Sequence, residues 1–239
     1  MSDLIVNVDL GGILRTVSRK SEPDPAQIAM LAELFGANGV SIQFRRDKKY
    51  IREKDLFLLK GIIKSKFTIE LPPHEDTIAK IMEIKPTSVI ISADHADSDT
   101  PLSPIDFNNS PVDYSMYVNQ LSAVGISTGF FIEPEIDEVK GVAKSGAPAV
   151  FINCAGYTNA RSTDEAQHEL DRIDKAAQFA GRQNLHIIAG RGIDYKNIQP
   201  LLELKLVDDF IVGNAICARA ILLGMEHAVK EMKQLIDKV

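Results

Sequence analysis

Eight short runs of mostly apolar residues recur along the chain and constrain the fold more than any other feature of the sequence. They span residues 4–8, 40–44, 67–70, 88–92, 127–132, 149–153, 186–189 and 210–212. The runs are continuously apolar instead of alternating with polar residues, as is typical of parallel strands covered on both faces. We expect one strand in each run.

Helical patterns fill the gaps between these runs. Asp24 and Pro25 form an N-cap and a first-turn proline, which predicts a helix after the first strand. A second helix is predicted to open at Ser162, because apolar residues recur every three to four positions from 166 to 180. A last helix is predicted near the end of the chain, from about Met225 to Ile236.

Eight strand–helix units within 239 residues predict an α/β fold, a single (β/α)₈ TIM barrel with extra helical decoration that occupies residues 1–239. A doubly wound open sheet is the alternative, but no Gly-x-Gly-x-x-Gly follows the first strand. One long irregular segment, residues 93–111, is rich in Asp, Ser, Asn and Pro. A loop of that length in a compact domain is typical of a functional segment.

Charge and composition exclude several classes of protein. The net charge of −6 argues against a nucleic-acid surface, which needs a basic face. No apolar run is long enough to suggest a membrane span, and the first residues do not resemble a secretory signal. The two cysteines, Cys154 and Cys217, have no metal-ligand spacing, so we expect a cytoplasmic protein without a metal site.

Polar residues gather where the predicted strands end, which is where barrels of this kind place their active sites. Glycines that follow the last two strands, at positions 190, 192 and 213, would let backbone N–H groups approach a phosphate, and a helix start beyond Asn214 would add a favourable dipole. Glu70 is a candidate general base, or else an ion-pair partner of Arg45 or Arg191.

The order and spacing of several motifs resemble the pyridoxine 5′-phosphate synthase family over nearly the whole chain. The motifs are Val6-Asn7-Val8-Asp9, Pro23-Asp24-Pro25, Gly36-Ala37-Asn38-Gly39-Val40, Phe44-Arg45-Arg46-Asp47, Glu70, Lys85-Pro86, Ala189-Gly190 with Gly192, and Ile211-Val212-Gly213. The resemblance implies a homo-oligomeric TIM-barrel enzyme that uses no cofactor. Its family reaction condenses 1-deoxy-D-xylulose 5-phosphate with 3-amino-2-oxopropyl phosphate.

The resemblance also assigns roles to individual residues. Glu70 matches a catalytic glutamate, while Gln43 and Arg191 stand at the positions of two catalytic histidines. The positions that contact substrates or their phosphates are matched by Asn7, Asp9, Arg45, Thr100, Gly192 and Gly213, with Asn214 beside them in place of a histidine. Further departures are Leu10 and Tyr50, which replace histidines, and Phe151 and Asn153, which replace the glutamate and the histidine of a Glu-Leu-His-Thr-Gly motif.

These departures affect residues that transfer protons in the family reaction. Histidine exchanges protons near neutral pH, whereas glutamine does not titrate and arginine stays protonated. General acid–base catalysis contributes roughly 10²–10⁴-fold per group, so the family reaction should be impaired unless His74 or His95 replaces the missing histidines.

We therefore expect a diverged synthase-like protein that binds a phosphorylated small metabolite, with activity lost or altered. A non-catalytic metabolite-binding or assembly homologue is the alternative from another class. A third hypothesis is another sugar-phosphate barrel enzyme; a Schiff-base aldolase would favour a lysine at a strand end, and none of the predicted strands ends in one.

Overall fold

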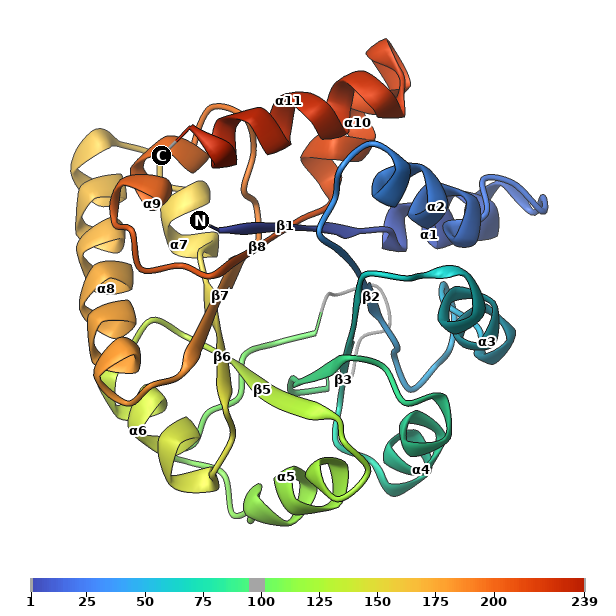
Figure 1. Ribbon diagram of the computed structural model, residues 1–239. Coiled ribbons are helices and arrows are strands. Elements are labelled where there is room, and N and C mark those ends of the chain that lie inside the picture. The colour runs from blue at the N-terminus through green and yellow to red at the C-terminus, as the bar shows by residue number, and fades with distance from the viewer. Residues whose placement is uncertain (1, 95–101, 239) are drawn as a thin grey trace.

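Parallel strands close into a barrel in the computed structural model, which describes residues 2–94 and 102–238. Eight strands pair in chain order, and β8 returns to pair with β1 (Figure 1). They are β1 (Asp3–Asn7), β2 (Gly39–Gln43), β3 (Lys66–Leu71), β4 (Ser88–Ile91), β5 (Ser127–Ile132), β6 (Ala149–Asn153), β7 (His186–Gly190) and β8 (Asp209–Val212). Every predicted run overlaps one of these strands, which confirms the TIM-barrel prediction and excludes the open sheet.

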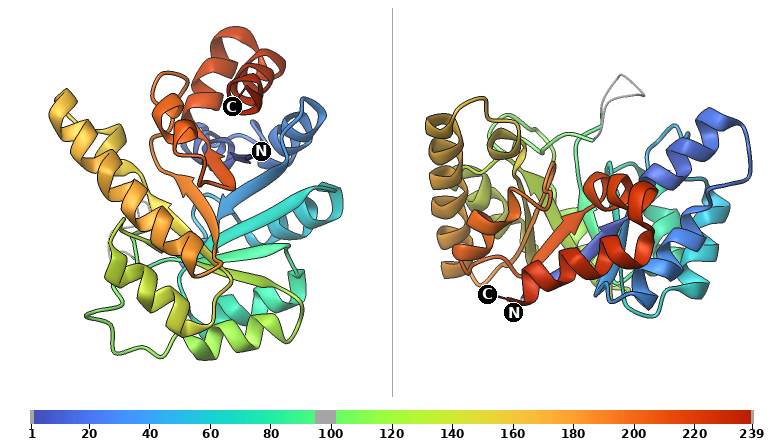
Figure 2. Two further views of the ribbon diagram at one scale, coloured as in Figure 1. Left: turned by 60° about the vertical axis from the view of Figure 1, so that its left-hand side comes forward. Right: turned by 90° about the horizontal axis from the view of Figure 1, so that it is seen from above.

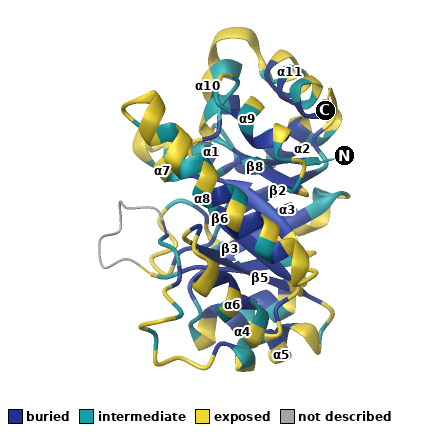
Figure 3. Ribbon diagram, turned by 90° about the vertical axis from the view of Figure 1, so that its left-hand side faces the viewer, coloured by how far each residue is buried: buried dark blue, intermediate teal, exposed yellow. Residues whose placement is uncertain are grey.

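Helices surround the barrel, and the strands at its centre are buried (Figure 3). In the described residues they are α1 (Asp9–Ser18), α2 (Pro25–Leu34), α3 (Glu53–Ile62), α4 (Glu75–Ile84), α5 (Ser115–Ser122), α6 (Ile136–Ser145), α7 (Ala155–Thr158), α8 (Thr163–Arg182), α9 (Ile198–Glu203), α10 (Asn214–Leu223) and α11 (Met225–Asp237). The last helix packs against β1 and α2, beside the first strand (Figure 2). No helix of the described residues is both long and apolar enough to cross a membrane.

The predicted helix starts are confirmed by their caps. The Asp24 carboxylate accepts a hydrogen bond from the Ala26 backbone at 2.9 Å, and the Ser162 hydroxyl accepts one from Glu165 at 3.1 Å. Helix α1 was not predicted, because Gly11 and Gly12 near its start disfavour a helix. A Cβ on Gly12 would lie 2.6 Å from the Tyr50 carbonyl oxygen, so close packing requires glycine there.

The barrel interior is apolar on one side. Side chains from β4 to β8 form a buried inner cluster that contains Ile90, Phe131, Ala149, Phe151 and Ile188, with Ile211 packed against it. This cluster fills the barrel below the ends of β5 and β6. Any site at the carboxyl ends of the strands therefore rests on an apolar base.

The opposite end of the barrel carries an ion network, which we call the floor. It consists of the first residues of four strands: Asp3, Lys66, His186 and Asp209. The Lys66 ammonium lies 2.8 Å from a carboxylate oxygen of Asp3 and 2.8 Å from one of Asp209. The other Asp209 oxygen lies 2.7 Å from His186 Nε2, so the network links four strands.

Candidate active site at the mouth of the barrel

A chain of hydrogen bonds joins the carboxyl ends of the first three strands. The Asn7 amide donates to one Asp9 oxygen at 2.8 Å, and the Gln43 backbone donates to the other at 2.8 Å. The Gln43 side chain then donates to Glu70 Oε2 at 3.0 Å. Gln43 thus bridges two carboxyl groups, and the structure brings together four of the residues predicted for the site.

In this chain of hydrogen bonds, the carboxyl group of Asp9 has a raised pKa. Asp9 stands at the start of α1, half-buried, with its carboxylate held between Asn7 and Gln43. Burial raises the pKa of Asp9 to about 7; the hydrogen bonds from Gln43 and Asn7 oppose this rise, and the nearby charge of Glu70 adds to it. Asp9 can therefore gain and lose a proton near neutral pH.

Glu70 is buried and receives its hydrogen bonds from three sides. Besides the Gln43 amide, the Ser92 hydroxyl donates to Glu70 Oε1 at 2.7 Å, and Arg191 Nη2 bonds the same oxygen. Of the two ion-pair partners predicted for Glu70, the described contacts place Arg191 there. Arg45 is also buried, with its Nε 3.5 Å from an Asp47 oxygen.

Arg191 extends over the apolar base of the site. Its guanidinium carbon lies 4.3 Å from the centre of the Phe131 ring and 5.5 Å from that of Phe151, distances at which a cation is attracted to an aromatic face. Arg191 itself adopts a φ of 78°, in the left-handed region that non-glycine residues rarely occupy.

The turns after β7 and β8 bring the backbone into close contact with neighbouring side chains. Gly192 has a φ of 74°, and a Cβ there would lie 2.2 Å from the Thr158 hydroxyl oxygen. Gly213 precedes α10, and a Cβ on it would lie 3.0 Å from the Asn7 Cβ. Asn214, the first residue of α10, is exposed at this helix start. Backbone N–H groups at such a helix start favour an anion.

Some predicted residues lie elsewhere or outside the described part. Thr100 and His95 fall in residues 95–101, outside the described residues. His74 precedes α4, where its Nε2 lies 3.2 Å from an Asp94 oxygen, and its side chain is 40% exposed. Asn153 donates to Glu133 at 2.8 Å in an exposed bond.

Sequence reasoning missed three contributors to the site. Ser92 follows β4 and holds Glu70, while Phe131 and Phe151 form the surface beneath Arg191. The position of Ser92 at the end of a predicted strand was a usable signal. The aromatic support was not, because it depends on the path that the Arg191 side chain takes.

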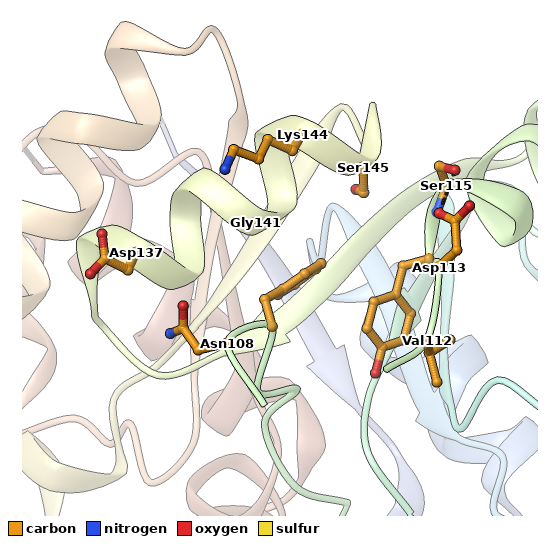
Figure 4. A pocket seen from close by; sticks show the side chains of 10 residues that line it. Asn108, Val112, Asp113, Ser115, Asp137, Gly141, Lys144 and Ser145 are labelled. Atoms are coloured by element: carbon orange, nitrogen blue, oxygen red, sulfur yellow. Dashed lines mark hydrogen bonds between the residues drawn. The ribbon is translucent and has the colours of Figure 1, made fainter. Parts of the chain in front are cut away.

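A pocket of about 310 Å³ lies on the outside of the barrel between α6 and the segment before α5 (Figure 4). Asn108, Asp113, Asp137 and Lys144 are among its lining residues. None of the residues predicted for the site lines it. The described residues contain no group of three or more His, Cys, Asp or Glu side chains that could hold a metal ion.

Comparison with known proteins extends over the whole barrel. The family model described as "Pyridoxal phosphate biosynthesis protein PdxJ" matches residues 4–238. A pyridoxine 5′-phosphate synthase from Synechococcus sp. (strain JA-2-3B'a(2-13)) is 32% identical over 234 residues, covering 98% of both chains. Another from Pelobacter propionicus is 32% identical over 236 residues, covering 99% of both.

Solved structures with low sequence identity share the fold. A thiamine phosphate pyrophosphorylase from Pyrococcus furiosus matches with a TM-score of 0.65 at 15% identity, covering 99% of this chain and 96% of that one. KGPDC from Streptococcus mutans matches with a TM-score of 0.66 at 10% identity, covering 100% and 99%. At such identities the likeness concerns the barrel alone.

Proposed function

The chain belongs to the PdxJ family of pyridoxal phosphate biosynthesis proteins, and from this premise we propose that it is a diverged pyridoxine 5′-phosphate synthase-like protein with an altered reaction. It binds a phosphorylated small metabolite at the mouth of the barrel. Gly192, Gly213 and the start of α10 receive the phosphate, with Asn7 alongside. Thr100, in the segment that follows β4, contributes by family resemblance.

This proposal rests on the residues that stand at the positions of the two proton-transferring histidines of the family. Gln43 does not titrate and Arg191 is a permanent cation, so neither supplies what the two family histidines supply. Arg191 also bonds the Glu70 carboxylate, the candidate base. Asp9, with a pKa near neutrality, is left to exchange protons beside Glu70.

We expect the purified protein to bind 1-deoxy-D-xylulose 5-phosphate but to form little or no pyridoxine 5′-phosphate from the two family substrates. The double variant Gln43→His with Arg191→His should raise product formation by about 100-fold or more, because each positioned acid–base group contributes roughly 10²–10⁴-fold. Calorimetry measures the binding, and a product assay measures the turnover.

Gly213→Val provides the control for the phosphate position. Its side chain would press on Asn7, so binding of every phosphorylated ligand should be lost while the barrel remains folded. Full synthase activity in the unmodified protein would contradict the proposal. If the double variant is inactive, the substitutions at Leu10, Tyr50, Asn153 or Asn214 have also changed the pocket.

A non-catalytic metabolite-binding role is the second candidate. The Arg191–Glu70 ion pair favours it, because a base that is already bonded to a guanidinium is poorly placed to take a proton from a substrate. Binding without turnover in both the wild type and the double variant would support this role.

We also propose that the chain forms a homo-oligomer. Large apolar side chains are exposed on neighbouring helices of one side, where α2 packs on α1 and α11, and α11 on α10. They are Val17, Met30, Leu34, Ile221 and Leu222. Such a concentration of exposed apolar side chains is typical of a contact surface, and sedimentation of wild type against Leu222→Lys tests it.

A further inference from the structure

Two side chains hold the turn that follows β7 by bonding two successive backbone carbonyls. The hydroxyl of Thr158, the last residue of α7, donates to the Arg191 carbonyl oxygen at 3.2 Å. The Ala155 carbonyl oxygen lies farther from the same hydroxyl, at 3.5 Å, so Arg191 is the nearer acceptor. The Asn197 side-chain amide donates to the Gly192 carbonyl oxygen at 3.0 Å. Both carbonyl oxygens of the turn therefore face protein side chains.

The same two bonds determine where the neighbouring N–H groups point. Both peptides are trans, and in a planar trans peptide the C=O and the N–H point in opposite directions. The Gly192 N–H therefore points away from Thr158, and the Ile193 N–H points away from Asn197. In the part of the chain that the structure describes, neither of these N–H groups donates a hydrogen bond.

The Gly192 N–H points along the barrel rim toward the end of β8. Thr158 belongs to the segment that follows β6, and β7 lies between β6 and β8 in the barrel. The direction away from α7 thus leads to Gly213 and the first turn of α10. The turns after β7 and β8 therefore direct N–H groups toward the same region.

The backbone of this turn adopts a conformation that needs support. Arg191 and Gly192 have φ values of 78° and 74°, in the left-handed region that non-glycine residues rarely occupy. Such residues keep this conformation only where the surrounding structure fixes them. Glycine at 192 also permits the close approach of Thr158, because a Cβ there would lie 2.2 Å from the hydroxyl oxygen.

We propose that Thr158 and Asn197 are positioning residues of the phosphate site. By bonding the carbonyls of Arg191 and Gly192, they keep those oxygens away from the anion and present the Gly192 N–H to it. This inference rests on the proposed function, because it needs a phosphate at the β7 and β8 turns. Without these bonds the peptides are free to rotate, and a carbonyl oxygen turned toward the phosphate repels it.

Thr158→Val tests the first of the two bonds, because valine has nearly the shape of threonine but no hydroxyl. Glycerol 3-phosphate is the probe, with its affinity measured by calorimetry and its contacts by backbone amide NMR. In the wild type it should shift the amide resonances of Gly192 and Asn214. Thr158→Val should bind it about tenfold more weakly and lose the Gly192 shift, whereas Thr158→Ser should restore both.

Asn197→Ala removes the second bond and should also weaken binding, by about the same factor. Tyr157→Phe is the matched control. It removes another hydroxyl of α7, which donates to the Asn197 carbonyl oxygen at 2.9 Å and so links the same two segments without bonding the turn. This control should leave the affinity and the Gly192 shift unchanged. Urea denaturation of each variant separates a loss of stability from a loss of binding.

Wild-type affinity in Thr158→Val would overturn the positioning role and leave the phosphate site standing. An equal loss in Tyr157→Phe would also overturn it, since the docking of α7 as a whole would then be responsible. Failure of Thr158→Ser to restore binding would have the same meaning. If Thr158→Val does not fold, Asn197→Ala decides the question in its place. Absence of both heat and amide shifts in the wild type would refute the phosphate site itself, and the positioning role with it.

Discussion

The two ends of the barrel are both charged, but they combine charges differently. At the floor, carboxylates and cations alternate: Lys66 lies between Asp3 and Asp209, and His186 bonds the free oxygen of Asp209. At the mouth, Asp9 and Glu70 lie on either side of an uncharged Gln43, and Arg191 pairs with Glu70 alone of the two.

The pKa values of the charged groups at the two ends differ accordingly. At the floor, the hydrogen bond to Asp209 raises the pKa of His186. Burial alone would raise the pKa of Asp209, but the hydrogen bonds from His186 and Lys66 outweigh the effect of burial, so the pKa of Asp209 is lowered. At the mouth, burial raises the pKa of Asp9 to about 7. Matched charges thus make the floor a stabilising element, whereas the mouth retains a carboxyl group in an environment that disfavours its charge.

The largest effect should come from removing the central carboxylate of the floor. Asp209→Ala leaves Lys66 and His186 without their shared partner, and we expect a loss of about 3 kcal/mol in the free energy of unfolding. Urea denaturation measures it. Asp237→Ala removes a carboxylate from an exposed pair with Lys233 and should cost less than about 0.5 kcal/mol, as surface pairs do. Equal losses in the two variants would show that the floor adds no special stability.

At the mouth, removing a carboxylate should increase the free energy of unfolding, whereas at the floor it should decrease it. The folded-state pKa of Asp9 is raised, so its ionisation destabilises the fold increasingly from about pH 4 and fully above about pH 7. Asp9→Asn should therefore gain stability relative to wild type as the pH rises, on the order of 2 kcal/mol at about pH 8, since part of the benefit is lost with the Asn7 bond.

Denaturation of Asp9→Asn and wild type at both ends of this pH range is the measurement. A constant difference between the two proteins at all pH values would mean that Asp9 has an ordinary pKa. The comparison between mouth and floor would then fail, along with the role of Asp9 as the proton-exchanging group.

The smallest effect concerns the histidine of the floor. Because the folded-state pKa of His186 is raised, its ion pair stabilises the fold below about pH 6.5, and this contribution disappears as the pH rises through the folded-state pKa. His186→Gln should lose about 0.5–1 kcal/mol at about pH 6, a modest value because the side chain is partly exposed. The loss should shrink at about pH 9; a loss that persists there would indicate packing instead of charge.

The sequence was informative where local pattern decides structure. Continuous apolar runs predicted every strand, because parallel strands are covered on both faces whatever their neighbours are. The caps at Asp24 and Ser162 are local as well. Helix α1 escaped prediction because Gly12 is required by a contact with Tyr50, which is distant in the sequence.

The site was predictable as a set of strand ends but not as a network. The sequence leaves Arg45 and Arg191 as alternative ion-pair partners of Glu70. Arg191 is the observed partner, and the path of its side chain to Glu70 depends on contacts with Phe131 and Phe151. The raised pKa of Asp9 follows from burial, which no spacing reveals. The floor does have a signal in the sequence, since a charged or titratable residue opens four of the strands.

The stacking of Arg191 on Phe151 bears on the order in which such a site can evolve. If the chain descends from a sequence with the family motifs that it resembles, an arginine that came first would have stood between Glu70 and a glutamate at position 151, whereas a phenylalanine that came first would have lain beneath a histidine. We therefore expect the two substitutions to be epistatic, so that the effect of each depends on whether the other is present. Sequences that carry arginine at this position should carry an aromatic residue at the other, and each single reversion should be less favourable than the pair.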